Sequence, residues 1–133
     1  MVQQSDVDIT VAADPTAAGK ARRALAERRL VDSEREPALL LLVSELVTNS
    51  VRHAGLTEAE RIRLRARRQG HRCAYVEVCD AGRSGRMPNK REQSLDALQP
   101  GGLGLMLVDE MADRWGIERG DDETCVWFEL ACA

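Results

Sequence analysis

Three polar residues recur at four-residue spacing inside an apolar segment: Glu45, Asn49 and His53 in "SELVTNSVRHAG". The apolar residues around them predict a helix, and steps of four on a helix drift by only about 40°, so the three form one slanting stripe. This stripe borders the apolar side, so its polar groups need partners. A carboxylate and an amide oxygen can gather around a hydrated magnesium ion that also takes phosphate oxygens. A solvated helix edge with an i,i+4 hydrogen bond is the competing interpretation.

A second candidate lies at the end of a strand-like run, where "VEVCDAGRSG" places Asp80 just before Gly82. A carboxylate there can accept a hydrogen bond from an exocyclic amine such as that of adenine. A glycine beside it lets a flat base approach the chain closely. Asp and Gly are also common in ordinary turns, so this pattern alone does not indicate a site.

The third candidate is the glycine run in "PGGLGLMLV", which holds Gly101, Gly102 and Gly104 directly before an expected helix. Exposed N–H groups and the helix dipole suit phosphate at such a place. The run is neither GxxxxGK[ST] nor a GxGxxG after the first strand, so it is not a P-loop or a dinucleotide fingerprint. A plain glycine-rich connection explains it equally well.

The elements that must position these residues follow the order β, α, α, β, β, long loop, α, β, β. Strands are expected over 7–13, 61–68, 73–80, 115–119 and 124–131, and helices from Asp14 to about Leu30, from Ser33 or Glu34 to about His53 or Ala54 with Gly55 as C-cap, and from the glycine run to near Arg114. This order favours an α+β two-layer sandwich, in which a mixed, mostly antiparallel sheet of about five strands carries three helices on one face. A doubly wound parallel sheet is disfavoured because there are too few βαβ units.

Length and composition indicate one globular domain over residues 1–133, with 44% hydrophobic and 31% charged residues. Residues 1–6 are expected to be flexible, and residues 81–100 form a long loop of few apolar anchors. The net charge of −3 does not propose nucleic acid as a partner. No run approaches roughly 18 apolar residues and no signal pattern opens the chain, so we expect a cytoplasmic protein without membrane contact.

The four cysteines, Cys73, Cys79, Cys125 and Cys132, form no CxxC pair and have no histidine at zinc-like spacing. Three fall in strand-like segments, where a free cysteine acts as a small hydrophobe. The sequence therefore predicts reduced, structural thiols.

The order of the three patterns is more specific than any one of them. An E-x-x-x-N helix, a strand-terminal D-x-G, a long loop and a G-x-G-L helix start resemble the Bergerat-type ATP-binding domain shared by gyrase, heat-shock chaperones, histidine kinases and DNA mismatch-repair ATPases. The sequence is most similar to bacterial anti-sigma-factor serine/threonine kinases, through "LLVSELVTNSVRHAG", "VEVCDAG", "GGLGLMLVDEMADRWG" and "VWFEL". The resemblance spans roughly residues 7 to 131.

The resemblance implies a role for each matching residue. Glu45 would be the general base, Asn49 would bind Mg2+ and through it the phosphates of ATP, and Asp80 would accept from the adenine amine. His53 would lie near the phosphates and Gly82 beside the base. An ATP lid would span residues 83–100, with its hinge at Gly102, Leu103, Gly104 and Leu105. Thr124 or Cys125 would contact adenine through water. The second glycine of the family's Asp-x-Gly-x-Gly run stands one place late here, at Gly85.

The resemblance also implies what the protein does. It would use Mg-ATP to phosphorylate an anti-sigma-factor antagonist and would control a sigma factor by partner switching. Its partners would be the sigma factor, the antagonist, or both, and it would form a homodimer. A non-catalytic module that binds nucleotide or sequesters a partner is the alternative, because the late glycine loosens the family's lid pattern.

Overall fold

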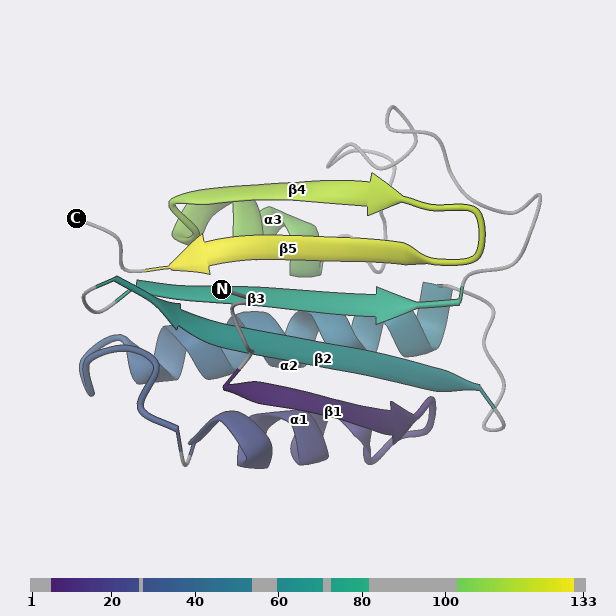
Figure 1. The fold of residues 1–133 in the computed structure, drawn as a ribbon, viewed down its shortest axis with the longest axis horizontal. Coiled ribbons are helices and arrows are strands. Elements are labelled where there is room, and N and C mark those ends of the chain that lie inside the picture. Colours follow the sequence, from purple (N-terminus) through teal and green to yellow (C-terminus); the bar gives the residue numbers. More distant parts are fainter. Residues whose placement is uncertain (1–5, 27, 54–59, 71–72, 82–102, 131–133) are drawn as a thin grey trace, which may run out of the picture.

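The computed structural model describes residues 6–26, 28–53, 60–70, 73–81 and 103–130, and Figure 1 shows them as one sheet with its helices on a single face. The elements are β1 (Val7–Ala12), α1 (Ala17–Ala26), α2 (Glu36–His53), β2 (Arg61–Gln69), β3 (Cys73–Asp80), α3 (Leu103–Met111), β4 (Arg114–Arg119) and β5 (Thr124–Leu130). The predicted α+β two-layer sandwich of three helices and five strands is confirmed. Three expected features lie outside the described residues: the lid over residues 83–100, the Gly55 cap and most of the flexible start over residues 1–6. Of that start the structure describes Asp6, whose carboxylate accepts a hydrogen bond from the backbone N–H of Arg68.

The strands follow the order β1-β2-β3-β5-β4, and each neighbouring pair in the described sheet is antiparallel. A hairpin joins β2 to β3, and Gly70 in its turn has a φ of +57°, which suits a residue without Cβ. The central strand β3 then pairs with β5, although α3 and β4 come between them in the chain. This crossover brings the end of β3 next to the start of β5, which is distant in the sequence.

Strand alternation separates the two faces of the sheet. In β2 the apolar residues Ile62, Leu64 and Ala66 are buried against the helices, while Arg63 and Arg65 point to the other face. The same alternation runs through the neighbouring strands, so one face packs into the core and the face that no described helix covers carries mainly charged and aromatic residues.

The first helix begins at Ala17, three residues after the start that the sequence predicts at Asp14. The Asp14 carboxylate accepts hydrogen bonds from the N–H of Thr16 at 2.8 Å and from its hydroxyl at 2.6 Å. These bonds lower the pKa of Asp14 and hold the chain at the helix entrance.

Two predicted helix ends are wrong. The α1 helix ends at Ala26 rather than near Leu30, because Arg29 adopts a left-handed φ of 50° that a helix does not continue. The α3 helix ends at Met111 rather than near Arg114, which already belongs to β4. In addition, α2 begins at Glu36, slightly later than expected. Within the described residues no helix has both the length and the apolar character needed to cross a membrane.

Candidate functional site

The polar stripe lies on α2 at the border of its buried side. Glu45 and Asn49 are half-buried, while Leu42 and Leu46 beside them are 0% and 2% exposed. A half-buried carboxylate and amide present oxygen atoms to a space that is only partly in water. His53 is the last residue of α2, and its side chain lies outside the described part.

A contact between α1 and α2 shows on which side of α2 the polar stripe lies. The Arg22 guanidinium of α1 donates to the Ser44 hydroxyl at 2.8 Å, so Ser44 marks the side of α2 that faces α1. At about 100° per residue, Asn49 lies roughly 140° around the helix from Ser44. Because α2 also packs against α3, the Glu45–Asn49 border lies on the α3 side.

The predicted strand-end residue, Asp80, has Thr124 as its direct partner. Asp80 closes β3, Thr124 opens β5, and the two are opposite each other in the register. Both lie on the helix-facing side of the sheet, like the buried Val78, and Thr124 is itself only 8% exposed. Cys125 points to the opposite face, so of the two candidates for the adenine contact only Thr124 shares a face with Asp80.

The helix start after the glycine run is confirmed at Leu103. Leu105 is buried, and the indole N–H of Trp115 donates to Asp109 at 2.9 Å, which fastens α3 to β4. Gly104 belongs to the first turn of α3, and its N–H is among those that a helix leaves without an internal partner. Gly82 and Gly102 lie outside the described residues.

The C-terminal end of α2 and the Asp80–Thr124 pair lie at one end of the molecule. Figure 1 shows that α2 and β3 end, and β5 begins, at the same end of the sheet. The arrangement places the Asp80 carboxylate at the strand ends and the Glu45 and Asn49 side-chain oxygens on α2. Half-buried carboxylate and amide oxygens fit a magnesium ion that keeps most of its water. A cavity of about 630 Å³ lies at the other end, beside Arg68, and is not part of this arrangement.

The prediction of reduced thiols is wrong. Cys79 and Cys125 form a disulfide between directly opposite positions of β3 and β5, with their Cα atoms 4.0 Å apart. Cys73 is disulfide-bonded as well, and Cys132 lies outside the described residues. Spacing in the sequence could not show the first pair, because it depends on β3 lying next to β5. Had the pairing of Asp80 with Thr124 been known, the pairing of the adjacent cysteines would have followed.

A family model and several solved structures match this chain. The model of the histidine kinase-like ATPase domain matches residues 11–130. The structure of the RsbU and RsbW domains of Rv1364c from Mycobacterium tuberculosis matches with a TM-score of 0.67 and 20% identity, over 93% of this chain and 31% of that one. The histidine kinase domain from the Erythrobacter litoralis EL346 blue-light activated histidine kinase matches with a TM-score of 0.57 and 26% identity, over 73% of this chain and 44% of that one.

The chain thus spans less than half the length of either solved chain. No curated protein matches it. The family model nevertheless covers nearly all of the sequence, including α2, Asp80 and the start of α3. This chain belongs to the histidine kinase-like ATPase domain family.

Proposed function

We propose that the protein binds Mg-ATP and acts as an anti-sigma-factor serine/threonine kinase that phosphorylates an anti-sigma-factor antagonist. The observation that carries the proposal is the half-buried pair Glu45 and Asn49 on α2, the helix whose C-terminal end lies at the same end of the molecule as Asp80 and Thr124. Membership of the ATPase family supports nucleotide binding. The kinase assignment rests on the resemblance of the sequence motifs, and the solved chain with RsbU and RsbW domains has the same fold.

In this proposal the strand ends select the base. The Asp80 carboxylate accepts a hydrogen bond from the adenine amine, and Thr124 contacts the base through a water molecule. Gly82 would lie beside the ring. A carboxylate accepts but does not donate when ionised, so it distinguishes the amine of adenine from the carbonyl oxygen of guanine at the same position.

The phosphates would extend from the base toward α2 and α3. Asn49 would hold Mg2+, which supplies positive charge to neutralise the phosphates when bound. Leu103, Gly104 and Leu105 in the first turn of α3, together with Gly102 before it in the sequence, would offer N–H groups to the phosphates, and His53 would lie near them.

Glu45 would then accept the proton of the substrate serine or threonine hydroxyl as that oxygen bonds to the terminal phosphorus of ATP, while the bond from this phosphorus to the bridging oxygen breaks and ADP leaves. Phosphoryl transfer depends mainly on positioning and charge stabilisation, and this set of residues supplies both. A new phosphate adds roughly −2 charge to the antagonist and breaks a docked interface with like charge. The protein would then exchange the antagonist for its sigma factor, in the cytoplasm and as a homodimer.

A non-catalytic module is the second candidate. It is favoured by the late position of Gly85, which departs from the family's glycine pattern at the start of the expected lid. Such a module would bind nucleotide or a partner without transferring phosphate.

One experiment separates the two functions. Calorimetric titration of ATP and labelled phosphate transfer to candidate antagonist proteins would be measured for wild type, Asn49→Ala and Glu45→Gln. Glu36→Gln is the matched control, because it makes the same change on the same helix about 14 Å away. We expect wild-type binding of about −7 to −8 kcal/mol, weakened in Asn49→Ala or without magnesium. Glu45→Gln should keep this binding and lose transfer, and Glu36→Gln should keep both.

The other outcomes are equally informative. Binding without transfer to any candidate would favour the module. Binding of no ATP, with or without magnesium, would remove the nucleotide function altogether. Equal transfer by Glu45→Gln and wild type would show that Glu45 is not the base.

A further inference from the structure

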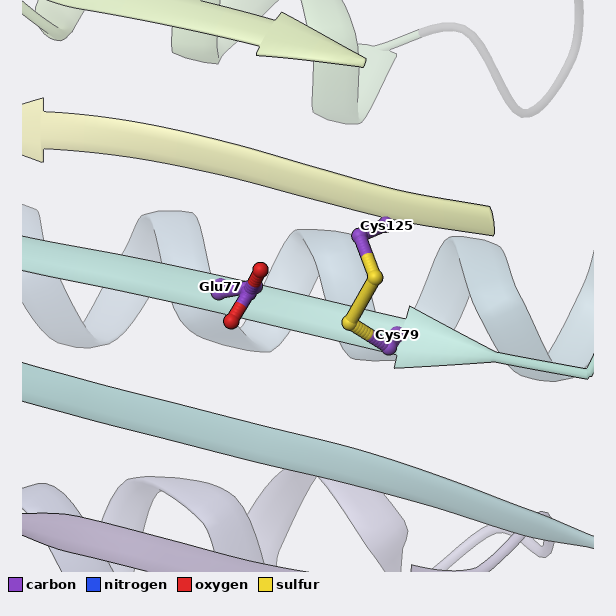
Figure 2. A group of neighbouring side chains, drawn as sticks. All are labelled: Glu77, Cys79 and Cys125. Carbon is purple, nitrogen blue, oxygen red and sulfur yellow. A yellow bond between two sulfur atoms is a disulfide. The ribbon is translucent and has the colours of Figure 1, made fainter. Parts of the chain in front are cut away.

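Two sulfur atoms and a carboxylate gather on the face of the sheet opposite the helices. Glu77 and Cys79 stand two residues apart on β3, and Cys125 faces Cys79 from β5. One ligand atom from each of the three lies within 4.8 Å of the others. Figure 2 shows the Glu77 carboxylate along the strand from the disulfide, on the same face.

The cluster is shielded from water. Cys79 and Cys125 are 5% and 7% exposed, and the Glu77 side chain is 14% exposed. The guanidinium of Arg65 lies 3.6 Å from a Glu77 oxygen, which is longer than a hydrogen bond. A mostly buried carboxylate with so distant an ion-pair partner retains capacity for a closer cation.

The disulfide keeps the sulfurs from acting as ligands, because metals bind the thiolate. A dithiol reductant can open it by exchange: two electrons and two protons pass to the protein, Cys79 and Cys125 become thiols, and the reductant becomes a disulfide. The cytoplasm, where we propose the protein acts, keeps most thiols reduced. The reduced pair is therefore a form that the protein would meet there.

We propose that reduction turns this cluster into a binding site for a thiophilic divalent cation such as Zn2+. The thiolates of Cys79 and Cys125 and the carboxylate of Glu77 bind the ion, a water molecule completes the tetrahedron, and the two thiol protons pass to solvent. Zinc–sulfur bonds of about 2.3 Å and zinc–oxygen bonds of about 2.0–2.2 Å place tetrahedral ligands roughly 3.5–3.8 Å apart. Three ligand atoms already within 4.8 Å reach this spacing by side-chain rotation on fixed strands.

Cobalt(II) is a suitable probe, because thiolate ligation gives it a charge-transfer band and tetrahedral geometry gives it strong visible absorption. The full chain carrying Cys73→Ser and Cys132→Ser leaves Cys79 and Cys125 as its only two cysteines. We expect the charge-transfer band to saturate at one cobalt per chain after reduction by a phosphine, to be absent from the oxidised protein, and to disappear when zinc is added. ATP is not needed, so this outcome is independent of the nucleotide function.

Variants identify the ligands. Cys79→Ser should abolish the charge-transfer band, and Glu77→Gln should keep it but weaken cobalt affinity roughly tenfold or more. Glu129→Gln is the control, because Glu129 lies on the same face of β5 but outside the cluster. A reduced, folded protein without the band would overturn the proposal, and so would an equal band in Cys79→Ser. If circular dichroism shows that reduction unfolds the chain, cobalt must restore the fold, and failure to do so also overturns it.

Discussion

Tyr75 lies on the face of the sheet that no described helix covers, and its surroundings shift the pKa of its phenol. Its ring stacks on Trp127 with centroids 6.0 Å apart, and the Arg67 guanidinium lies 4.4 Å from the ring centre. Burial is the main cause that raises the pKa of Tyr75 above 10.0, and the negative charges of Glu77 and Glu118 add to it. A phenol on a sheet face is thus kept neutral by its neighbours.

The protein has a single tyrosine, so this shift can be measured without ambiguity. We expect the ultraviolet absorbance of tyrosinate to titrate at a higher pH than in free tyrosine. Glu77→Gln should lower the midpoint, because it removes a negative charge beside the phenol. Glu34→Gln, at an exposed position before α2, should leave it unchanged. A midpoint equal to that of free tyrosine would contradict the burial of this side chain.

The raised pKa of Tyr75 also determines how the stability of the folded protein changes with pH. The folded protein holds the phenol proton to higher pH than the unfolded chain, whose tyrosine titrates near about 10. Stability is therefore unaffected by this group below that pH, and it falls as the pH rises through the pKa of the folded state.

At the scale of elements, the pairing of β4 with β5 depends on Gly116. Gly116 is opposite Trp127, and a Cβ added there would lie 2.8 Å from the indole nitrogen. The ring therefore occupies the space that any other residue would need, in contact with Tyr75 on its far side.

We expect Gly116→Ala to lower the free energy of unfolding by about 1–3 kcal/mol, because the indole must leave its place over the strand. Urea unfolding measures this change. Gly120→Ala is the matched control, since its nearest neighbour for a new Cβ is the Glu123 carbonyl oxygen at 3.6 Å. If both variants unfold alike, the close approach of Trp127 does not matter for stability.

Local patterns were sufficient to predict most elements. Alternation in β2 and the glycine run before Leu103 predicted a strand and a helix start, and Asp14 marked the start of α1 to within three residues, because each depends on nearby residues. What could not be predicted depends on distant ones. The disulfide and the partnership of Asp80 with Thr124 arise only when β5 pairs with β3, and the early end of α1 depends on the backbone of Arg29. The functional roles of Glu45, Asn49 and the other candidate site residues stay predictions.

For the molecule as a whole, the Cys79–Cys125 disulfide is a long-range constraint. It joins residues 46 positions apart, so it limits the unfolded chain over a long loop. In the chain-entropy description, a loop of this length corresponds to about 4 kcal/mol of stabilisation. Folded domains of this size are stable by only about 5–15 kcal/mol, so the bond is a substantial share and the reduced protein should still fold.

We therefore expect Cys79→Ser with Cys125→Ser to lower the free energy of unfolding by up to about 4 kcal/mol in oxidising buffer. Guanidinium unfolding with both proteins oxidised gives the difference. Repeating the measurement with both proteins reduced is the control, since the two should then become nearly equal in the absence of metal. An oxidised double variant as stable as the wild type would show that the bond adds no stability.

The two tryptophans stand on opposite sides of the sheet. Trp115, held by Asp109, faces the layer of helices, while Trp127 faces outward beside Tyr75. The protein thus contains two intrinsic fluorophores, one for each side. If either tryptophan is replaced by phenylalanine, the fluorescence of the other reports on one face of the sheet alone. Movement of α3 would then be followed through Trp115 and changes around the cysteines through Trp127.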